Sequence, residues 1–586
     1  MTIEDFTLNA EVVNILDDLQ IHFSNRNFEI SDIIDDDGHQ FVDIVQEGGG
    51  VLGVALLGYT YVLEEMGIRF LNIGGTSAGA INSLLLASVD TPANKKTTKI
   101  LEIIANKNLN DFVDGDSDAK SFINVFIKKK VTLLKLIFKG AQVIDNFRDD
   151  LGLNPGENFY NWLKDIVESF GIHDISDLEN RMMDLPKSIR ARDKRHDLIK
   201  NEHFTIGSRL AVIAAEVNTE TKVEFPRMRE LFYKNIDKVH PADFVRASMS
   251  IPLFFKPFIV EDLPRDEETI KQWKRMAAHR GGPPKKAVFV DGGVMSNFPI
   301  DTFHRVGTPS RPTVGVKLGI ERVSNKNINA IGDLLYGCFN AARNLRDFEF
   351  IHKNPDYKNL VSFIDTNDYS WLDFNVSDEV KVNLFVEGAR AAKSFLQSFD
   401  WNAYKKTRNA LKSSVYNAAE IDEIITTIND VAHHKDEFYD PDDIFNLKER
   451  FSSLNKRINA HVLWIDDKPK LIERERTLLN QLGVNVTLVS STSEAKAVLN
   501  DKFDAFDFVI SDVSRGHQKT EDDETNLTEG IEFTAWLSRV YPRYKRKVIF
   551  YIIGLDLSRG VPPFAFGITD SPIELVHLIL DLSFRD

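Results

Sequence analysis

The sequence predicts an α/β protein in which a large domain is followed by a smaller one. In the first half, strand-like runs at residues 41–45 and 70–73 lead into glycine turns, and a helix-forming stretch follows at 78–88. From residue 461 a second alternation of strands and helices begins. A chain of 586 residues is long enough for both domains to bury a core.

The composition restricts the class of protein. A formal net charge of −16 argues against nucleic-acid binding and against general attraction to anionic lipid. The single cysteine, Cys338, excludes an intramolecular disulfide framework and suits a reducing compartment. The N-terminal stretch carries acidic residues without a signal-peptide pattern, and no apolar run approaches the ~20 residues of a transmembrane helix. We therefore expect a cytoplasmic protein.

The pentapeptide GTSAG, with Gly75, Ser77 and Gly79, is a G-x-S-x-G motif between a predicted strand and a predicted helix. Small residues on both sides of the serine let the chain turn sharply and expose the hydroxyl above the sheet. Because such a motif also occurs by chance as a packed turn, its weight depends on its neighbours. Together with them it makes Ser77 the candidate nucleophile.

A glycine run, GGGVLG at residues 48–53, closely follows the first predicted strand. Glycine N–H groups approach a tetrahedral oxyanion without a Cβ in the way. The alternative is a dinucleotide or phosphate loop, but the spacing is not that of a Rossmann fingerprint and no P-loop Lys-Ser/Thr pair follows. We predict an oxyanion hole at Gly48, Gly49 and Gly50, with Gly49 and Gly50 as donors and Gly53 as support.

An apolar run at residues 287–290 predicts a strand that delivers Asp291 into the turn Gly292-Gly293. A carboxylate at a strand end beside a serine accepts its proton when desolvation raises its basicity. His304 is the nearest candidate for the alternative, a Ser-His mechanism. We predict that Asp291 is the base.

The motifs GGGVLG, GTSAG and DGGVMSNFP, in this order and spacing, resemble those of the patatin-like phospholipases. FVRASMSIP at residues 244–252 resembles a further segment of that family, and residues 363–366 and 388–392 resemble its closing strand and helix. The resemblance covers residues 40–400 and implies a three-layer α/β/α hydrolase domain. It also implies a Ser77–Asp291 dyad that cleaves acyl esters of membrane phospholipids, with no cofactor and no metal in this domain.

Two other functions stay open on the sequence. One is a catalytically silent signalling or scaffold protein that keeps the same shell. The other is a serine hydrolase of soluble acyl esters or thioesters. The presence of both Ser77 and Asp291 favours an enzyme, but the motifs do not separate one acyl substrate from another.

A basic apolar segment, FINVFIKKKVTLLKLIFK at residues 122–139, lies within a predicted cap insertion at about residues 105–205. A basic amphipathic helix can lie in a bilayer interface, so the segment suggests peripheral membrane contact. The alternative is a cap helix with solvated lysines, and a lid could alternate between the two. The lysines concerned are Lys128, Lys129, Lys130, Lys135 and Lys139.

The remaining boundaries follow from pattern and composition. We expect a helical extension at 1–39, the hydrolase domain at 40–400, a polar helical connector at 401–458 and the smaller domain at 459–586. In the connector, His433 and His434 are adjacent, so their side chains point apart and favour a solvated charge cluster over a metal site.

Three carboxylates mark the smaller domain. Asp466 and Asp467 follow its first predicted strand and Asp512 follows its third, at the carboxyl edge of one parallel sheet. The domain resembles a response-regulator receiver, which is flavodoxin-like in fold. That resemblance implies Asp512 as phosphoacceptor and Mg²⁺ held by Asp466 and Asp467.

The smaller domain departs from the receiver pattern at two places. Receivers carry Thr or Ser after the fourth strand and Lys after the fifth, whereas residues 552–554 read IIG and residues 567–572 read GITDSP. Without the lysine, a phosphoryl group loses its cationic partner. We expect a degenerate receiver used for docking a regulatory partner or for self-association, with control by phosphorylation as the alternative.

Overall fold

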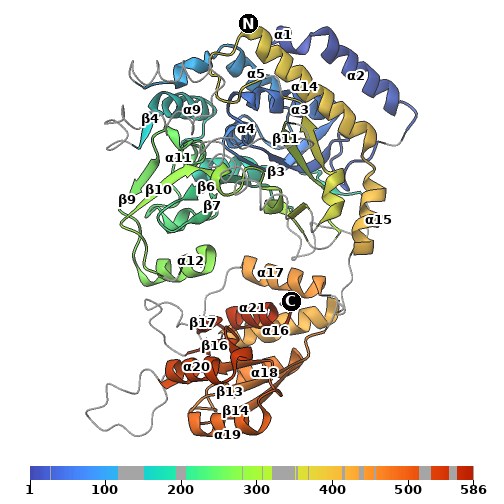
Figure 1. Cartoon of the computed structure of the whole chain (residues 1–586). Coiled ribbons are helices and arrows are strands. Elements are labelled where there is room, and N and C mark those ends of the chain that lie inside the picture. Colours follow the sequence, from blue (N-terminus) through green and yellow to red (C-terminus); the bar gives the residue numbers. More distant parts are fainter. Residues whose placement is uncertain are drawn as a thin grey trace, which may run out of the picture. The chain divides into compact units, whose positions relative to one another are not determined.

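The structure is a computed structural model that describes residues 1–26, 28–115, 151–192, 206–279, 281–305, 308–319, 350–351, 354–366, 369–411, 416, 418–433, 441–454, 457–513, 529–552 and 564–584. The chain divides into two compact units (Figure 1). The first comprises Met1–His304 and Pro309–Thr407, and the second comprises Arg305–Thr308 and Arg408–Asp586.

A ten-stranded mixed sheet forms the centre of the first unit. Its strands are β1 (Ile33–Ile34), β2 (Gln40–Gln46), β3 (Ile68–Thr76), β5 (Arg190–Ala191), β6 (Leu210–Glu216), β7 (Thr221–Phe225), β9 (Phe258–Glu261), β10 (Lys286–Asp291), β11 (Thr313–Leu318) and β12 (Val361–Ile364). The main path is β12-β11-β2-β3-β6-β10-β9, parallel from β12 to β6 and antiparallel from β6 to β9. The predicted strands at 41–45, 70–73 and 287–290 are confirmed as β2, β3 and β10.

Strands β2 and β3 are buried along their whole length, as expected of parallel strands in the middle of a sheet, and they include the buried polar residues Asp43, Arg69 and Asn72. A separate parallel pair joins β4 (Gly152–Asn154) to β8 (Leu253–Phe255). On one face of the sheet, Phe41 and Leu71 form a small apolar cluster with residues of β1 and β5 and with neighbouring loop residues.

Helices of the first unit pack against this sheet and against one another. They are α1 (Glu4–Thr7), α2 (Ala10–Phe23), α3 (Val54–Glu65), α4 (Ala78–Ser88), α5 (Thr97–Ala105), α9 (Glu157–Ser169), α10 (Ile175–Met183), α11 (Pro241–Ser248), α12 (Glu267–Ala277), α14 (Asp378–Ser398) and α15 (Trp401–Leu411). Short 3₁₀ turns are η1 (Gly50–Gly53), η2 (Leu109–Phe112), η3 (Arg229–Leu231), η4 (Gly292–Val294), η5 (Ile300–Phe303) and η6 (Pro355–Asn359). The helix predicted at 78–88 is confirmed as α4.

Helices α3 and α4 contact β3, while α14 lies alongside α3 and α2 (Figure 1). The approach of α3 to α14 depends on two glycines. A Cβ on Gly58 would stand 1.9 Å from the carbonyl oxygen of Phe385, and one on Gly388 would stand 1.9 Å from that of Ala55. The absence of side chains at these two positions therefore sets the spacing of the helix pair.

The second unit contains a five-stranded parallel sheet. Its strands are β13 (Ala460–Ile465), β14 (Val484–Val489), β15 (Phe508–Ser511), β16 (Val548–Tyr551) and β17 (Gly567–Thr569), in the order β14-β13-β15-β16-β17. Its helices are α16 (Ala418–His433), α17 (Pro441–Ser453), α18 (Glu473–Gln481), α19 (Thr492–Lys502), α20 (Glu529–Val540) and α21 (Pro572–Ser583), with η8 at Pro542–Tyr544. This strand order is that of the flavodoxin-like fold, as predicted.

Residues 401–458, expected to form a connector, are shared between the two units. Trp401 and Tyr404 of α15 are buried in the core of the first unit. Apolar residues of α16 and α17, among them Ile428 and Phe451, are buried with the sheet of the second unit. The second core therefore begins upstream of its first strand. Among the described residues, no helix combines the length and apolarity needed to cross a bilayer.

Candidate active site

Ser77 occupies the turn between β3 and α4. Its backbone has φ 52 and ψ −116, in the positive-φ region that residues other than glycine rarely adopt. Two glycines make room for the turn: a Cβ on Gly75 would lie 2.5 Å from the carbonyl of Gly79, and one on Gly79 would lie 2.2 Å from the carbonyl oxygen of Gln46. The G-x-S-x-G motif therefore forms a strained strand-to-helix elbow.

The glycine loop is bonded to the turn that follows Asp291. The N–H of Gly48 donates to the carbonyl of Asn297 at 3.0 Å, and the Asn297 side-chain Nδ2 donates back to the carbonyl of Gly48 at 3.1 Å. The Thr76 hydroxyl donates to the carbonyl of Ser296 at 3.0 Å. These bonds bring together the three motifs that the sequence separates by more than two hundred residues.

The predicted oxyanion donors differ in their availability. The N–H of Gly48 is already engaged with Asn297, so this glycine holds the loop in place instead of offering a donor. The N–H groups of Gly49 and Gly50 have no acceptor among the described residues, and Gly50 lines a cavity together with Ser77. Gly53 packs beneath the elbow, where a Cβ would lie 3.1 Å from that of Ala78. Gly49 and Gly50 are thus the donors that the geometry favours.

Asp291 ends β10 at the same end of the sheet as Ser77. Thr76 is paired with Ile213 of β6, and Asp291 is paired with the next residue of that strand, Ala214. Because β6 lies between the two positions, their backbones are about two strand spacings, roughly 10 Å, apart. The Asp291 carboxylate is buried and accepts a hydrogen bond from the N–H of Gly293 at 2.7 Å.

Gly292 allows this turn to pack against the sheet, since a Cβ there would lie 2.0 Å from the carbonyl oxygen of Ile213. The turn is thereby pressed onto the same strand that separates Asp291 from the elbow. Asp291 itself is absent from the residues that line the cavity beside Ser77.

Two serines that follow one another closely connect the elbow to the aspartate. The Ser248 hydroxyl accepts a hydrogen bond from the N–H of Ser77 at 2.9 Å and donates to the carbonyl of Ile213 at 2.6 Å. The carbonyl of Ser250 accepts from the N–H of Asp291 at 2.8 Å. The segment at residues 244–252 is therefore a brace between the two predicted reacting residues.

Arg246 anchors this brace from within the protein. It is 5% exposed and donates to the Ser250 hydroxyl at 2.5 Å, to the carbonyl of Pro155 at 2.6 Å and to that of Lys256 at 2.9 Å. Burial lowers the pKa of Arg246 to about 10. Because this value is still well above 7, the guanidinium is charged near neutral pH. Residues 244–252 were noted in the sequence only for their family resemblance, and no role was predicted for Ser248 or Ser250. No role was predicted for Asn297 either.

A buried ion pair lies under the glycine loop. Lys317 Nζ is 2.9 Å from Glu47 Oε1, the N–H of Leu318 donates to Glu47 Oε2 at 2.7 Å, and Asn297 donates to Glu47 Oε1 at 3.1 Å. The side chains of the pair are 8% and 7% exposed. With its carboxylate oxygens engaged in this way, Glu47 fixes the start of the glycine loop.

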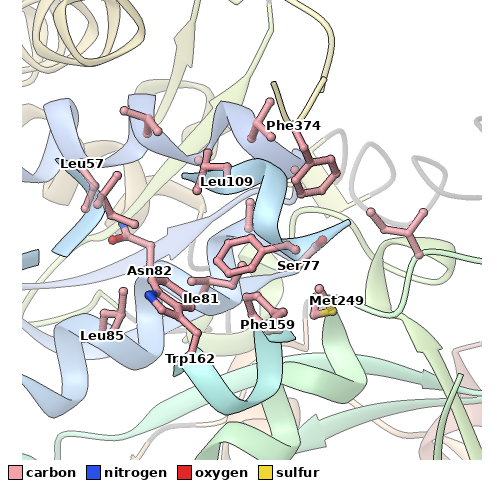
Figure 2. Close-up of a pocket in the computed structure, with 18 of the residues that line it drawn as sticks. Leu57, Ser77, Ile81, Asn82, Leu85, Leu109, Phe159, Trp162, Met249 and Phe374 are labelled. Carbon is pink, nitrogen blue, oxygen red and sulfur yellow. The ribbon is translucent and has the colours of Figure 1, made fainter. Parts of the chain in front are cut away.

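An apolar cavity opens beside Ser77 (Figure 2). Its wall comes from α3, α4, α5, η2, α9 and the segment after α11, and Ser77 and Asn82 are the hydrophilic side chains among its described lining residues. Figure 2 shows Ile81, Asn82 and Leu85 following one another along α4 away from Ser77. A chain of methylenes fits such a wall better than a polar substrate does.

His304 lies in a different environment from Ser77. Its Nδ1 is 2.8 Å from the Tyr357 hydroxyl, and its ring stands edge-on to Phe350 with the centroids 5.0 Å apart. His304 does not line the cavity. These contacts favour a packing role for this histidine.

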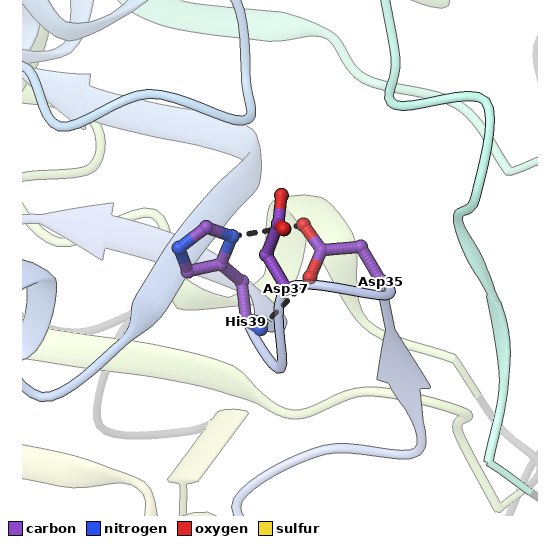
Figure 3. Close-up of side chains that lie close together, drawn as sticks. All are labelled: Asp35, Asp37 and His39. Carbon is purple, nitrogen blue, oxygen red and sulfur yellow. Dashed lines mark hydrogen bonds and ion pairs between the residues drawn. The ribbon is translucent and has the colours of Figure 1, made fainter.

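A second polar cluster, Asp35, Asp37 and His39, occupies the turn between β1 and β2 (Figure 3). Asp35 is buried and accepts from His39 Nδ1 at 2.9 Å and from the His39 N–H at 2.8 Å. The other ring nitrogen, Nε2, is 3.0 Å from an Arg69 nitrogen. Since both ring nitrogens are engaged and a guanidinium adjoins the ring, we assign the cluster to the stability of the turn.

In the second unit the three predicted carboxylates do meet. One oxygen each of Asp466, Asp467 and Asp512 lies within 4.8 Å of the others, at the ends of β13 and β15. Clustered carboxylate oxygens are ligands that Mg²⁺ prefers. No lysine occurs between residues 548 and 586, which includes β17 and α21.

The five lysines of residues 122–139, and His434, lie outside the described residues.

The sequence of the first unit matches a known protein family. Residues 44–304 match the family model of the patatin-like phospholipases, a stretch that includes the glycine loop, Ser77 and Asp291. An uncharacterized Bacillus subtilis (strain 168) protein, YqhO, is 28% identical over 363 residues, which are 62% of this chain and 100% of that protein.

Solved structures similar to this chain match about a fifth of it. One is a response regulator receiver domain protein from Clostridium thermocellum, with 22% identity, a TM-score of 0.18, and coverage of 22% of this chain and 95% of that one. Another is RcsB from Salmonella enterica serovar Typhimurium, solved bound to promoter rprA with the phosphomimetic BeF3−, with 25% identity, a TM-score of 0.17, and coverage of 21% and 98%. The strand order of the second unit, β14-β13-β15-β16-β17, is that of the flavodoxin-like fold.

Proposed function

We propose that this protein cleaves acyl ester bonds of membrane phospholipids, because residues 44–304 match the family model of the patatin-like phospholipases. Ser77 is the nucleophile and Asp291 the base. The observation that carries the proposal is the position of Ser77, at a strained elbow and in the wall of an apolar cavity. The acyl chain occupies this cavity, and the ester carbonyl lies at the Ser77 hydroxyl.

In the first step the Ser77 oxygen attacks the acyl carbonyl while its proton passes to the Asp291 carboxylate. The negative charge that develops on the carbonyl oxygen is stabilised by the N–H groups of Gly49 and Gly50. Collapse of the tetrahedral intermediate breaks the ester bond, and the leaving lysophospholipid alkoxide takes the proton from Asp291. Water then attacks the acyl carbon of the Ser77 ester while Asp291 takes its proton, and the Ser77 oxygen recovers that proton as the fatty acid leaves.

The second unit regulates this activity by docking a partner or by self-association. Its support is the carboxylate cluster at the sheet edge combined with the lack of a lysine in the last strand and helix. Were Mg²⁺ bound by Asp466, Asp467 and Asp512, it would neutralise charge at that edge. Removing the chain from residue 408 onward, where the second unit resumes, is expected to alter the basal lipase rate or the oligomeric state. An unchanged rate and size would exclude this regulation.

The protein acts in the cytoplasm and binds the membrane surface through the basic segment at residues 122–139.

The proposed hydrolysis is tested by measuring fatty-acid release from mixed phospholipid vesicles beside release from a soluble ester of the same acyl chain. Release from vesicles that disappears in Ser77→Ala supports the proposal. Turnover of the soluble ester alone would indicate a hydrolase of soluble acyl compounds, and no turnover of either would indicate a scaffold.

A further inference from the structure

Asn82 is a polar residue in the largely apolar wall of the cavity. It lies on α4, five residues beyond Ser77, between Ile81 and Leu85 in the cavity lining (Figure 2). Five residues of α-helix correspond to roughly 7.5 Å along the helix axis. A substrate chain that starts at Ser77 and runs beside α4 therefore passes Asn82 in its interior, well before reaching Leu85.

The Asn82 amide is only half satisfied. Its Nδ2 donates to Gln46 Oε1 at 2.5 Å, while its Oδ1 is buried and has no hydrogen-bond partner among the described residues. The residue is 4% exposed, so bulk water does not solvate the oxygen. Exchanging the amide oxygen and nitrogen, with Gln46 exchanged as well, still leaves one polar atom of Asn82 unpaired. Such a buried orphan destabilises the protein until a ligand satisfies it.

We propose that the acyl pocket of this protein selects fatty acyl chains that carry a hydroxyl group in their interior, and that Asn82 is the residue that binds this hydroxyl. The inference rests on the proposed function in one respect, namely that the cavity holds an acyl chain. A hydroxyl both donates and accepts, so it satisfies the free Asn82 atom in either orientation of the amide. A plain chain leaves that atom unpaired and gains no compensating bond.

The selectivity that follows depends on a polar contact, not on the packing of methylenes. A site with a buried polar group discriminates against the ligand that lacks the matching hydroxyl, because the group is then left unsatisfied. For one neutral hydrogen bond we expect about tenfold tighter binding of the hydroxylated chain. The preference should peak for one hydroxyl position, the one level with Asn82.

The direct test is binding of free fatty acids to the full chain, measured by calorimetry with chains of equal length that carry no hydroxyl or a single hydroxyl stepped along the chain. We expect one mid-chain isomer to bind about tenfold more tightly than the plain acid. Equal affinity for all isomers and for the plain acid would overturn the inference, and this comparison needs no variant.

Variants assign the effect to Asn82. Asn82→Leu, similar in size and apolar, should bind the plain acid at least as well as the wild type and lose the preference for the hydroxylated one. Asn82→Ser keeps a polar group and should retain part of it. Ile81→Val trims the same wall without changing its polarity, and should weaken both ligands equally. A preference that survives in Asn82→Leu would place the hydroxyl elsewhere and overturn the assignment.

Hydrolysis separates this inference from the proposed function. Cleavage of plain and hydroxylated esters at equal rates, with equal binding of the acids, removes the inference and leaves the hydrolase. Selective binding of the hydroxylated acid without cleavage of either ester removes the hydrolase and leaves the binding site.

Discussion

The hydroxyl of Ser248 accepts a hydrogen bond from the backbone N–H of Ser77 at 2.9 Å, and this contact spans 171 positions of the sequence. Because the same hydroxyl donates to the carbonyl of Ile213 at 2.6 Å, it links the elbow to the strand that separates Ser77 from Asp291. The strained backbone at Ser77 is therefore held by a side chain that does not react.

Ser248→Ala should lower kcat about tenfold to a hundredfold with little change in KM, because a misplaced nucleophile loses its attack geometry while the acyl pocket is intact. It should also cost roughly 1–3 kcal/mol of stability, since two buried polar groups lose a partner. Ser208→Ala is the matched control: Ser208 is buried and donates to the carbonyl of Leu71 at 2.7 Å, away from the cavity. Equal losses of kcat in both variants would count against a positioning role.

Ser77→Ala and Asp291→Asn should each reduce ester hydrolysis by at least roughly four orders of magnitude, because nucleophile and base act as one unit. Thermal unfolding should show that both variants remain folded. His304→Gln should retain most activity, since His304 is bonded to Tyr357 and lies outside the cavity lining. A loss at His304 as large as that at Ser77 would restore a histidine mechanism.

Gly79→Ala should destabilise the first unit by about 1–3 kcal/mol or more and abolish activity, because the added Cβ would stand 2.2 Å from the backbone of Gln46. Gly207→Ala is the control, since a Cβ there meets nothing within 4 Å. That change should be neutral or stabilising by about 0.4–1 kcal/mol. Chemical denaturation of the two variants measures both effects, and an active, stable Gly79→Ala protein would contradict the elbow geometry.

The stability of the second unit should fall in mild acid because of His577. Burial and the neighbouring Arg450, whose Nη1 lies 2.7 Å from His577 Nδ1, lower the pKa of His577 from 6.5 to about 4. The folded unit thus holds this imidazole neutral, while the unfolded chain protonates it below pH 6.5.

The stabilisation of the second unit that comes from neutral His577 is fully present above pH 6.5 and is lost as the pH falls towards 4. The total loss in the free energy of unfolding is about 3 kcal/mol. Hydrogen exchange at the amides of β13 to β16 in the full chain reports it. In His577→Gln the same pH range should change the exchange much less. A wild-type profile that is flat between these pH values would show that His577 is not held neutral.

Asp512→Asn should leave the lipase rate and the oligomeric state unchanged if the second unit works as a docking domain. The reason is the absence of a lysine from β17 and α21, which leaves a phosphoryl group on Asp512 without its cationic partner. Incubation with acetyl phosphate followed by intact-mass measurement checks this. Labelling that disappears in Asp512→Asn, with a matching change in lipase rate, would establish control by phosphorylation.

The sequence by itself determined the elements around the site and their order. Strand β2, strand β3 and helix α4 were predicted near their observed bounds, because buried apolar runs, glycine turns and helix formers act over a few residues. The parallel sheet of the second unit was likewise readable from its alternation, and so was the meeting of Asp466, Asp467 and Asp512 at one edge.

Only the tertiary structure decided how the site is supported and what shape it has. The engagement of Gly48 by Asn297, the brace at Ser248 and the unpaired amide of Asn82 all depend on atoms far apart in the chain. The cavity wall is also assembled from distant segments, with Phe112 and Trp162 packing at 5.0 Å between ring centroids. Local sequence encodes backbone preference, whereas hydrogen-bond partners and cavity walls are set by which segments the core brings together.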